Sequence, residues 1–341
     1  MAVESSRSWL EPGAWLVAPG VYRIPLPLPM ERLRAVNVYV IESDNGLVMI
    51  DGGWALAESR AALDAALQSI DRRATEIERI FVTHIHRDHY TQAVRLSRDV
   101  GAHVLLSGRE RRSLKALNDL NANDPQIEML EEAGAPMLAR HWRDVVQNRA
   151  RDLSMWGDPD EWLLSEARID VGSRVLEVLE TPGHTQGHLV FVDRDNGLIF
   201  SGDHVLPTIT PSIGYEPVVT PLPLADYLAS LARVRGLPDL ILLPAHGPAG
   251  ASLHARVDEL AAHHATRLAG CREATSGKPK TAHEVAMRLL WTRRLHAFGE
   301  LDSYDAALGV LEARAHLEVL CARGQLRRRR EDDHVVYEAL D

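Results

Sequence analysis

A dense run of polar side chains directly follows a short apolar segment early in the chain. Residues 80–82 read Ile-Phe-Val, which is typical of a buried strand, and residues 83–90 read Thr-His-Ile-His-Arg-Asp-His-Tyr. Histidine and aspartate are seldom buried without a partner, and removing this whole group from water would be costly. A divalent cation offsets that cost, because imidazole nitrogens and carboxylate oxygens are metal ligands. The stretch therefore predicts a metal site at the end of a strand.

The spacing within this stretch adds detail. Side chains alternate in an extended segment, so His84 and His86 point the same way and Asp88 can join them. His89 breaks the alternation, which indicates that the chain turns into a helix with Asp88 near its N-terminus. One tight turn could thus present two ligands to one metal and two to a second. The alternative is a polar loop between strand and helix that contains histidines by chance.

The composition places the chain among ordinary globular proteins. Its 341 residues are 45% hydrophobic and 25% charged, and the length suggests two or three domain-sized units. A formal net charge of −10 gives no general field for nucleic acid, although a local basic patch is compatible with it. The two cysteines, Cys271 and Cys321, predict neither a disulfide framework nor a thiolate metal site.

Neither a secretory signal nor a membrane span is visible in the sequence. Residues 1–7 do not form a basic segment that leads into an apolar one. No apolar run approaches the roughly 20 residues that a membrane helix needs. The expectation is a cytoplasmic enzyme without a membrane partner.

Two parts of the chain share one pattern. Residues 36–50 read as a strand, an Asp-Asn-Gly turn and a second strand that ends at Asp51. Residues 190–200 repeat this order and end just before Asp203. Asn-Gly tolerates the positive φ angles of a type I′ hairpin turn, so both segments predict hairpins. The match is either chance or an internal duplication, in which two sheet-and-helix halves face each other and the two aspartates meet at one edge.

The stretch between these halves, at about residues 107–164, is longer than a plain connection. It has helical patterning at residues 126–132 and 138–146. Three tryptophans lie in it: Trp142, Trp156 and Trp162. The segment is interpreted either as a surface insertion whose tryptophans attach it to the core or as a lid over an active site, and the two are compatible.

The last quarter of the chain has a different pattern. A helix is predicted over residues 253–267, and Thr281 with Glu284 forms a capping box for a second helix. A third helix over residues 305–322 precedes a hairpin within residues 325–338. Three helices followed by a hairpin are typical of a winged helix. Many winged helices bind nucleic acid, and others only mediate contacts.

Further candidate ligands also stand at the ends of strands. His184 lies in Thr-Pro-Gly-His after an apolar strand at residues 175–179. His246 lies in Ala-His-Gly-Pro after another strand at residues 240–243, and Asp203 ends the strand described above. Strand ends can gather side chains at one edge of a sheet, so these residues are expected to meet the first motif.

The ordered motifs resemble those of the metallo-β-lactamase superfamily over roughly residues 15–250. The matching residues are Asp51, His84, His86, Asp88, His89, His184, Asp203 and His246. The resemblance implies an α/β fold, a four-layer αββα sandwich with a helical insertion. It implies a catalytic domain over residues 1–251 and a winged-helix-like domain over residues 252–341.

The resemblance also implies a ligand set for two divalent metal ions. The first metal would be held by His84, His86 and His184, the second by Asp88, His89 and His246, with Asp203 bridging both. Asp51 is similar to an aspartate that orients ligands without binding metal. Two further histidines, His188 and His204, are interpreted as groups beside the ligands or at the surface.

These donor types suit zinc, and they are also compatible with manganese or iron. Two such ions about 3.5 to 4 Å apart can share a hydroxide, lower its pKa towards neutrality and stabilise an oxyanion. Asp88 could orient the hydroxide as well, which makes it the candidate catalytic residue. A non-catalytic binding module would be expected to have lost ligands, and none is missing here.

Within the superfamily, a carboxylate at position 203 with histidine at 89 is similar to the glyoxalase II, lactonase and ribonuclease Z branches. Thr91 and Gln92 depart from glyoxalase II, and no C-terminal glutathione-binding region is recognisable. The chain is most similar to the lactamase-β-2-like hydrolases, which join this catalytic domain to a winged helix. That branch contains ribonucleases and also thioesterases that release acyl chains from carrier proteins.

The leading hypothesis is therefore a metal-dependent hydrolase of a thioester or ester, with a small-molecule or carrier-bound acyl substrate. The alternatives are an endoribonuclease or another ester or amide hydrolase such as a lactonase. An endoribonuclease could use the arginines at residues 327–330 to bind RNA. Acidic residues 331–333 follow at once, however, so a self-compensated hairpin is the preferred interpretation.

Overall fold

The first of two large sheets is built from the N-terminal half of the chain. The computed structural model describes residues 8–29, 33–119, 124–147, 152–164, 166–292 and 295–340, so residues 1–7, where the absence of a signal was predicted, lie outside it. The strands of this sheet follow chain order: β1 (Trp15–Ala18), β2 (Val21–Pro27), β3 (Ala35–Glu42), β4 (Leu47–Ile50), β5 (Ile77–Phe81), β6 (His103–Ser107) and β7 (Glu161–Leu163). The first four strands are antiparallel, and β4 to β7 run parallel. Helices α1 (Ala57–Gln68) and α2 (Arg87–Val100) make the crossovers from β4 to β5 and from β5 to β6.

The second sheet comes from the middle of the chain. Its strands lie in the order β12-β11-β10-β9-β8: β8 (Arg168–Val171), β9 (Arg174–Glu180), β10 (Leu189–Asp193), β11 (Leu198–Gly202) and β12 (Ile241–Pro244). Only β11 and β12 pair in parallel, and α6 (Pro223–Arg235) connects them. Both sheets therefore contain a hairpin followed by a helix and a parallel strand.

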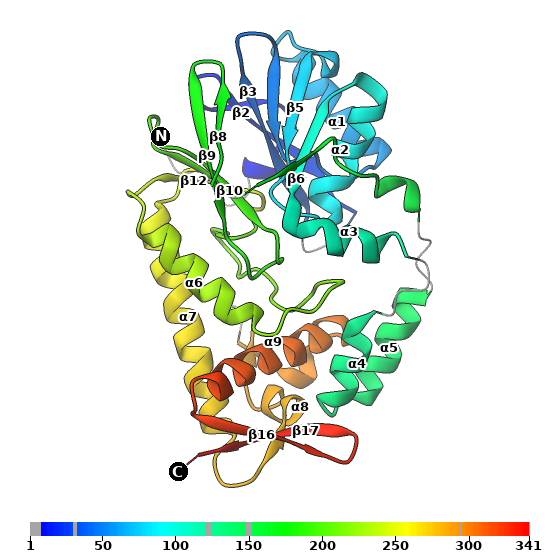
Figure 1. The fold of residues 1–341 in the computed structure, drawn as a ribbon, viewed down its shortest axis with the longest axis vertical. Helices are drawn as coiled ribbons and strands as arrows, with labels where there is room; N and C mark the ends of the chain where they lie inside the picture. The colour runs from blue at the N-terminus through cyan, green and yellow to red at the C-terminus, as the bar shows by residue number, and fades with distance from the viewer. Residues whose placement is uncertain are drawn as a thin grey trace.

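The sheets and helices form layers (Figure 1), and apolar side chains fill the spaces between them. One cluster fills the space between the sheets, where the rings of Phe81 and Phe191 lie 5.8 Å apart. A second joins the other face of the first sheet to α1 and α2, and a third joins the second sheet to α6 and α7 (Leu253–Ala274). Burying each large apolar side chain contributes about 1.5 to 3 kcal/mol. The predicted four-layer αββα sandwich is thus confirmed.

The predicted hairpins form, but neither has a type I′ turn. In the second, Gly197 alone of residues 194–197 has a positive φ. The loop of the first is the four residues 43–46 between paired Glu42 and Leu47, and neither Asn45 nor Gly46 has a positive φ. The Ser43 N–H donates to the Gly46 carbonyl at 3.0 Å. Glycine is required at 46 for close approach instead, since a Cβ there would lie 2.5 Å from a backbone oxygen of a neighbouring turn.

The insertion between β6 and β8 is helical, as predicted, and adds the short strand β7. Its helices are α3 (Arg111–Leu117), α4 (Pro125–Glu132) and α5 (Pro136–Gln147). Trp156 and Trp162 pack against the apolar cluster of the first sheet. Trp142 instead belongs to the cluster of the C-terminal elements, because α4 and α5 pack against α9 (Ser303–Ala322). Figure 1 shows α9 between α7 on one side and α5 on the other.

The C-terminal elements follow the expected order. They include α8 (Ala282–Ala286), α9, β13 (Lys280–Thr281), β14 (Leu290–Trp291), β15 (His296–Ala297), β16 (Leu326–Glu331) and β17 (His334–Ala339). The Thr281 and Glu284 capping box is present, and α7 extends to Ala274, beyond its predicted end. One apolar cluster runs continuously from the second sheet to α9. The winged-helix assignment and the boundary at residues 251 and 252 stay predictions.

The remaining elements are single turns of 3-10 helix: η1 (Ser8–Leu10), η2 (Ala74–Glu76), η3 (Gly108–Glu110), η4 (Leu153–Met155) and η5 (Phe298–Glu300). Cys271 is buried and Cys321 is half-buried, and both are free thiols. Across the described part of the chain, every helix is too short or too polar to cross a bilayer.

The variant Gly52→Ala tests the close packing of the chain after β4 against α2. A Cβ at this position would lie 2.4 Å from the backbone nitrogen of Ala93, and backbone atoms cannot move aside cheaply. We expect Gly52→Ala to lower the free energy of unfolding by about 1 to 3 kcal/mol, measured by denaturant titration. Gly299→Ala is the control, because its Cβ meets open space. Identical unfolding curves for Gly52→Ala and wild type would contradict the packing described here.

Candidate metal centre

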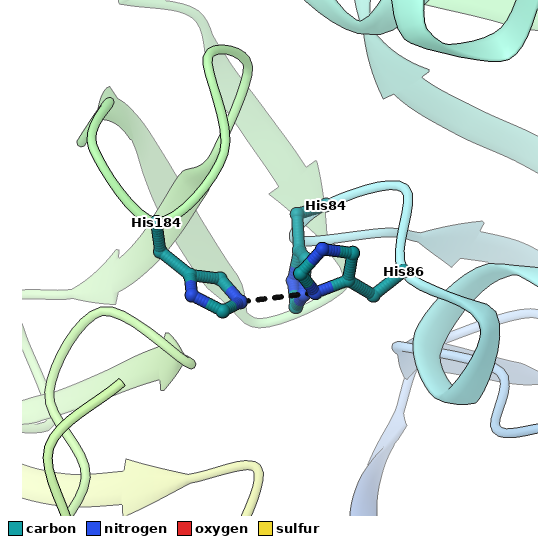
Figure 2. A group of neighbouring side chains, drawn as sticks. All are labelled: His84, His86 and His184. Atoms are coloured by element: carbon teal, nitrogen blue, oxygen red, sulfur yellow. Dashed lines mark hydrogen bonds between the residues drawn. The ribbon is translucent and has the colours of Figure 1, made fainter. Parts of the chain in front are cut away.

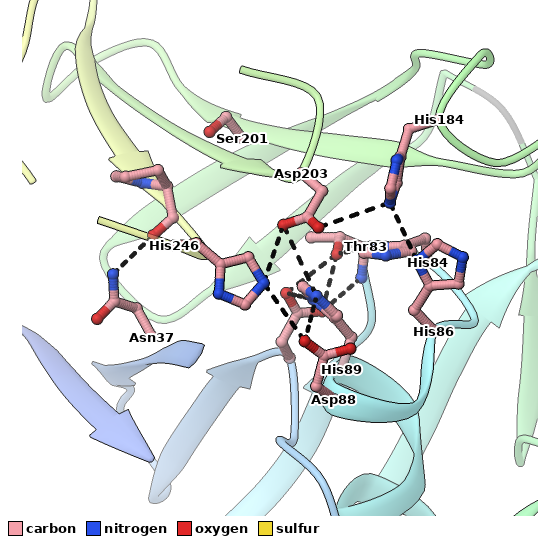
Figure 3. Close-up of polar contacts among 12 residues, drawn as sticks. Asn37, Thr83, His84, His86, Asp88, His89, His184, Ser201, Asp203 and His246 are labelled. Carbon is pink, nitrogen blue, oxygen red and sulfur yellow. Dashed lines mark hydrogen bonds and ion pairs between the residues drawn. The ribbon is translucent and has the colours of Figure 1, made fainter. Parts of the chain in front are cut away.

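The polar residues singled out in the sequence lie together at one edge of the two sheets (Figure 3). The loop after β5 carries His84 and His86, and α2 begins at Arg87, so Asp88 and His89 stand in its first turn. The other three follow the ends of β9, β11 and β12: His184, Asp203 and His246. The structure therefore brings all seven predicted ligands together.

Three histidines form the first group (Figure 2). Nitrogen atoms of His84, His86 and His184 all lie within 4.8 Å of one another, and His184 Nε2 is 3.0 Å from His86 Nδ1. Burial lowers the pKa of His86 to about 3 and that of His184 to about 4. Neutral imidazoles offer lone pairs, which is the state in which histidine binds a metal.

The second group combines a carboxylate with two histidines. Ligand atoms of Asp88, His89 and His246 lie within 4.8 Å of one another. Asp88 Oδ2 is 3.4 Å from His246 Nε2 and 3.8 Å from His89 Nε2. The Asp88 side chain is 17% exposed, compared with 3% for His246 and 0% for His89, so solvent reaches the group from the side of Asp88.

Asp203 lies between the two groups and turns one oxygen towards each. Its Oδ1 is 3.7 Å from His89 Nε2 and 3.5 Å from His246 Nε2. Its Oδ2 is 3.5 Å from His184 Nε2. A single carboxylate in this place can serve both groups at once (Figure 3).

Two of the histidine rings are held at Nδ1 by backbone carbonyl oxygens. The Nδ1 of His184 is 2.8 Å from the Ser212 carbonyl oxygen, and that of His246 is 2.8 Å from the Ala35 carbonyl oxygen. A carbonyl only accepts, so Nδ1 donates its proton in both rings, and Nε2 is the nitrogen that is left to face a cation. Histidines that bind metals are commonly held in this way.

Several polar atoms in the cluster are buried without a hydrogen-bond partner among the described residues. These atoms are Nε2 of His84, His86, His89 and His246, together with Oδ1 of Asp203. Buried polar atoms are nearly always paired, so such a convergence needs an explanation. Divalent cations coordinated by imidazole and carboxylate would satisfy these atoms, and the residues present therefore fit a metal centre.

Asp51 supports the cluster from behind. It accepts hydrogen bonds from the Thr83 N–H at 2.8 Å and hydroxyl at 3.0 Å, and its Oδ2 is 2.9 Å from His89 Nδ1. Its own backbone is left-handed, with φ of 60°. Burial alone would lower the pKa of His89, but the carboxylates of Asp51, Asp88 and Asp203 raise it to about 10. The carboxylates thus favour positive charge at this point.

The two additional histidines are both buried, so the surface alternative for them is wrong. His188 Nε2 accepts the Asp203 backbone N–H at 3.1 Å, and its Nδ1 is 2.9 Å from Thr181 Oγ1. The His188 ring stacks on that of His84 at 5.0 Å. Its role is therefore to orient Asp203 and His84. The His204 ring lies 5.2 Å from that of Tyr227 in α6.

Some supporting residues were not found by sequence reasoning. Asn37 Nδ2 donates to the carbonyl oxygens of Pro244 at 3.0 Å and Gly247 at 2.9 Å, which holds the turn that carries His246. A lone asparagine inside the apolar β3 strand was the available signal. Arg256 of α7 donates to the carbonyl oxygens of Leu206 and Ile209, in the loop after Asp203, and no local pattern marks that contact.

Comparisons with known proteins agree with this geometry. A family model described as the metallo-beta-lactamase superfamily matches residues 32–246. The probable metallo-hydrolase YqjP of Bacillus subtilis (strain 168) is 25% identical over 308 residues, which cover 87% of this chain and 90% of that protein. The hydroxyacylglutathione hydrolase GloC of Haemophilus influenzae is 25% identical over 57% of this chain and 79% of its own length.

A solved structure extends the likeness over nearly the whole chain. A metallo-beta-lactamase family protein from Thermus thermophilus superposes with a TM-score of 0.78 at 26% identity. The match covers 95% of this chain and 100% of that one. The likeness therefore includes the C-terminal elements as well as the two sheets.

Asp51→Asn tests the support behind the cluster. Asparagine keeps the shape of the side chain but replaces one of its two oxygens with an NH₂ group. Either the contact with Thr83 or the contact with His89 then loses its acceptor. We expect metal affinity to fall about 10- to 100-fold, measured by competition with a chromophoric chelator. The matched control is Asp193→Asn, which breaks a buried pair with Arg174 and should lower the melting temperature while metal affinity is unchanged. Equal metal affinity in Asp51→Asn and wild type would contradict the role of Asp51.

Proposed function

The chain belongs to the metallo-beta-lactamase superfamily and is a metal-dependent hydrolase, and we propose that it hydrolyses thioesters or esters of acyl groups at a dinuclear centre. The observation that supports the dinuclear centre most strongly is the position of Asp203, with one oxygen towards each histidine group. The hydroxyacylglutathione hydrolase among the relatives supports a thioester as the substrate.

In this proposal each group holds one cation. The first would be bound by His84, His86 and His184, the second by Asp88, His89 and His246, and both by Asp203. Nitrogen and oxygen donors without thiolates favour zinc. When bound, such cations activate water as a nucleophile near neutral pH and stabilise negative charge that develops on the substrate oxygen.

We assign to Asp88 the orientation of the attacking water. Burial opposes ionisation of this carboxyl group, but His89 and His246 hold its pKa below the usual value. The carboxylate therefore remains a hydrogen-bond acceptor at neutral pH. It is also the most exposed of the predicted ligands in the second group, so it stands on the side from which water and substrate arrive.

Aromatic side chains support an acyl substrate. Tyr215, in the loop after β11, is half-buried, and its ring lies 6.2 Å from that of His86. Trp142 of α5 packs edge-on against Tyr215 at 5.6 Å and stacks on Tyr304 of α9 at 5.2 Å. Trp142 is buried, so it and Tyr304 stand behind Tyr215, whose ring forms an apolar wall beside the first group. Such a wall suits a hydrocarbon or aromatic acyl chain.

The endoribonuclease alternative receives less support. The arginines on β16 are each paired with a carboxylate: Arg327 with Glu338, Arg328 with Glu318, Arg329 with Glu331 and Arg330 with Glu132. The acidic residues 331–333 were predicted to neutralise the charge of these arginines, but only Arg329 pairs with one of them. The other three arginines pair with carboxylates that lie farther away in the sequence. Paired arginines offer less positive charge to a phosphate backbone.

Substitution of single ligands tests the centre itself. We expect His84→Ala to lose the first cation, and Asp203→Ala to weaken both, because its two oxygens face different groups. Metal content after dialysis, measured by elemental analysis, reports this directly. His103→Ala is the control, because this exposed histidine pairs with Glu161 on the first sheet. Undiminished metal content in Asp203→Ala would contradict the ligand assignment.

A parallel substrate screen tests the chemistry. We expect acyl-glutathione, acyl-coenzyme A or acyl-carrier thioesters to be hydrolysed orders of magnitude faster than by the free metal ion, with lactones, β-lactams and RNA as comparison substrates. Asp203→Ala serves as the inactive control. Thioester rates no higher than those of free metal would contradict the proposal. RNA cleavage that is abolished by charge reversal of Arg327 and Arg328 would favour the endoribonuclease instead.

A further inference from the structure

Glu110 is a buried carboxyl group beside the proposed centre, and the ligand set does not use it. It ends η3, directly before α3, and its exposed fraction is 0%. Among the described residues no lysine or arginine forms an ion pair with it, and burial raises the pKa of its carboxyl group to about 7. Burying such a group without a cation costs several kcal/mol, so an apolar residue in the same space would destabilise the folded state less.

The Glu110 carboxyl group contacts the segment that contains His184. Its Oε1 accepts a hydrogen bond from the Thr185 hydroxyl at 2.5 Å, and the group also interacts with the backbone amide of Gly187. A Cβ at position 187 would lie 2.6 Å from Glu110 Cγ. Glycine at this position therefore allows the backbone to approach the Glu110 side chain closely.

The same carboxyl group interacts with the segment that contains the first two histidines. The backbone amide of Ile85, the residue between His84 and His86, lies close enough to lower the pKa of this carboxyl group, and Oε2 has no other partner at hydrogen-bond distance among the described residues. Because Thr185 directly follows His184, one side chain contacts both segments that supply the first group. Elsewhere the two segments are joined by backbone, where the Leu189 N–H donates to the Thr83 carbonyl at 2.7 Å.

We propose that Glu110 is a positioning residue for the metal centre. It fixes the distance between the segment of His84 and His86 and the segment of His184, and thereby sets the affinity of this group for its cation. Glu110 touches neither the cation nor the substrate in this proposal. The inference rests on the ligand set of the proposed function, but it does not depend on the identity of the substrate.

Glu110→Gln tests this role, because glutamine keeps the size of the side chain and one acceptor oxygen. We expect one of the two stepwise metal dissociation constants to rise about tenfold, which is typical when a group that supports metal ligands is changed. The constants are measured by zinc competition with a chromophoric chelator. The melting temperature of the metal-free protein should not fall, because a neutral amide replaces a buried acid.

Two further variants separate positioning from general packing. Thr185→Val removes the hydroxyl donor and should reproduce part of the loss, and the loss of metal affinity in the double variant with Glu110→Gln should be smaller than the sum of the two single losses. Glu216→Gln is the matched control. Glu216 is also buried, and its Oε2 accepts the Gln186 N–H at 2.8 Å, which lies in the His184 segment alone. The loss of metal affinity in Glu216→Gln should therefore be smaller than in Glu110→Gln.

The outcomes distinguish this inference from the function on which it rests. Two cations bound by Glu110→Gln as tightly as by wild type would overturn the positioning role alone. Equal losses in Glu110→Gln and Glu216→Gln would also overturn it, because a link between two segments would then not matter. A wild-type protein that binds fewer than two zinc ions would overturn the proposed dinuclear centre, and this inference with it. A loss in one binding step, with the metal-free protein as stable as wild type, supports the proposal.

Discussion

The imidazole of His89 lies between two aspartates, one from each half of the molecule. Its Nδ1 is 2.9 Å from Asp51, which follows β4, and its Nε2 is 3.7 Å from Asp203, which follows β11. Each aspartate follows a hairpin and precedes a crossover helix. The two aspartates can both reach His89 only because the two sheets face each other with these strand ends at the same edge. The arrangement also concentrates negative charge at one edge, and that field favours cations.

Elements from outside the two sheets complete the surroundings of this edge. Arg256 of α7 binds two carbonyl oxygens of the loop after Asp203, and Trp142 of α5 packs against Tyr215 of the same loop. The insertion and the C-terminal helices share one apolar cluster with the second sheet. This loop is therefore held from two sides, which links the proposed substrate wall to parts of the chain that carry no predicted ligand.

Local sequence patterns predicted the strands and helices well where side-chain periodicity is strong. Residues 80–82, 126–132 and 305–322 lie in or next to elements of the predicted type. The Asn-Gly turn was misjudged, because glycine at position 46 allows close approach to a neighbouring turn and does not need a positive φ. Trp142 was assigned to the insertion, but which core it would join could not be predicted, because α9 lies far along the chain.

The sequence by itself determined which side chains could coordinate a cation and that each follows the end of a strand. Both conclusions depend on residue chemistry and on periods of two or 3.6 residues, which are local properties. Only the tertiary structure decided that Asp203 turns one oxygen towards each group and that the Glu110 carboxyl group lies beside both histidine segments. Such contacts join residues far apart in sequence, and their distances follow from how the layers pack, which no local pattern contains.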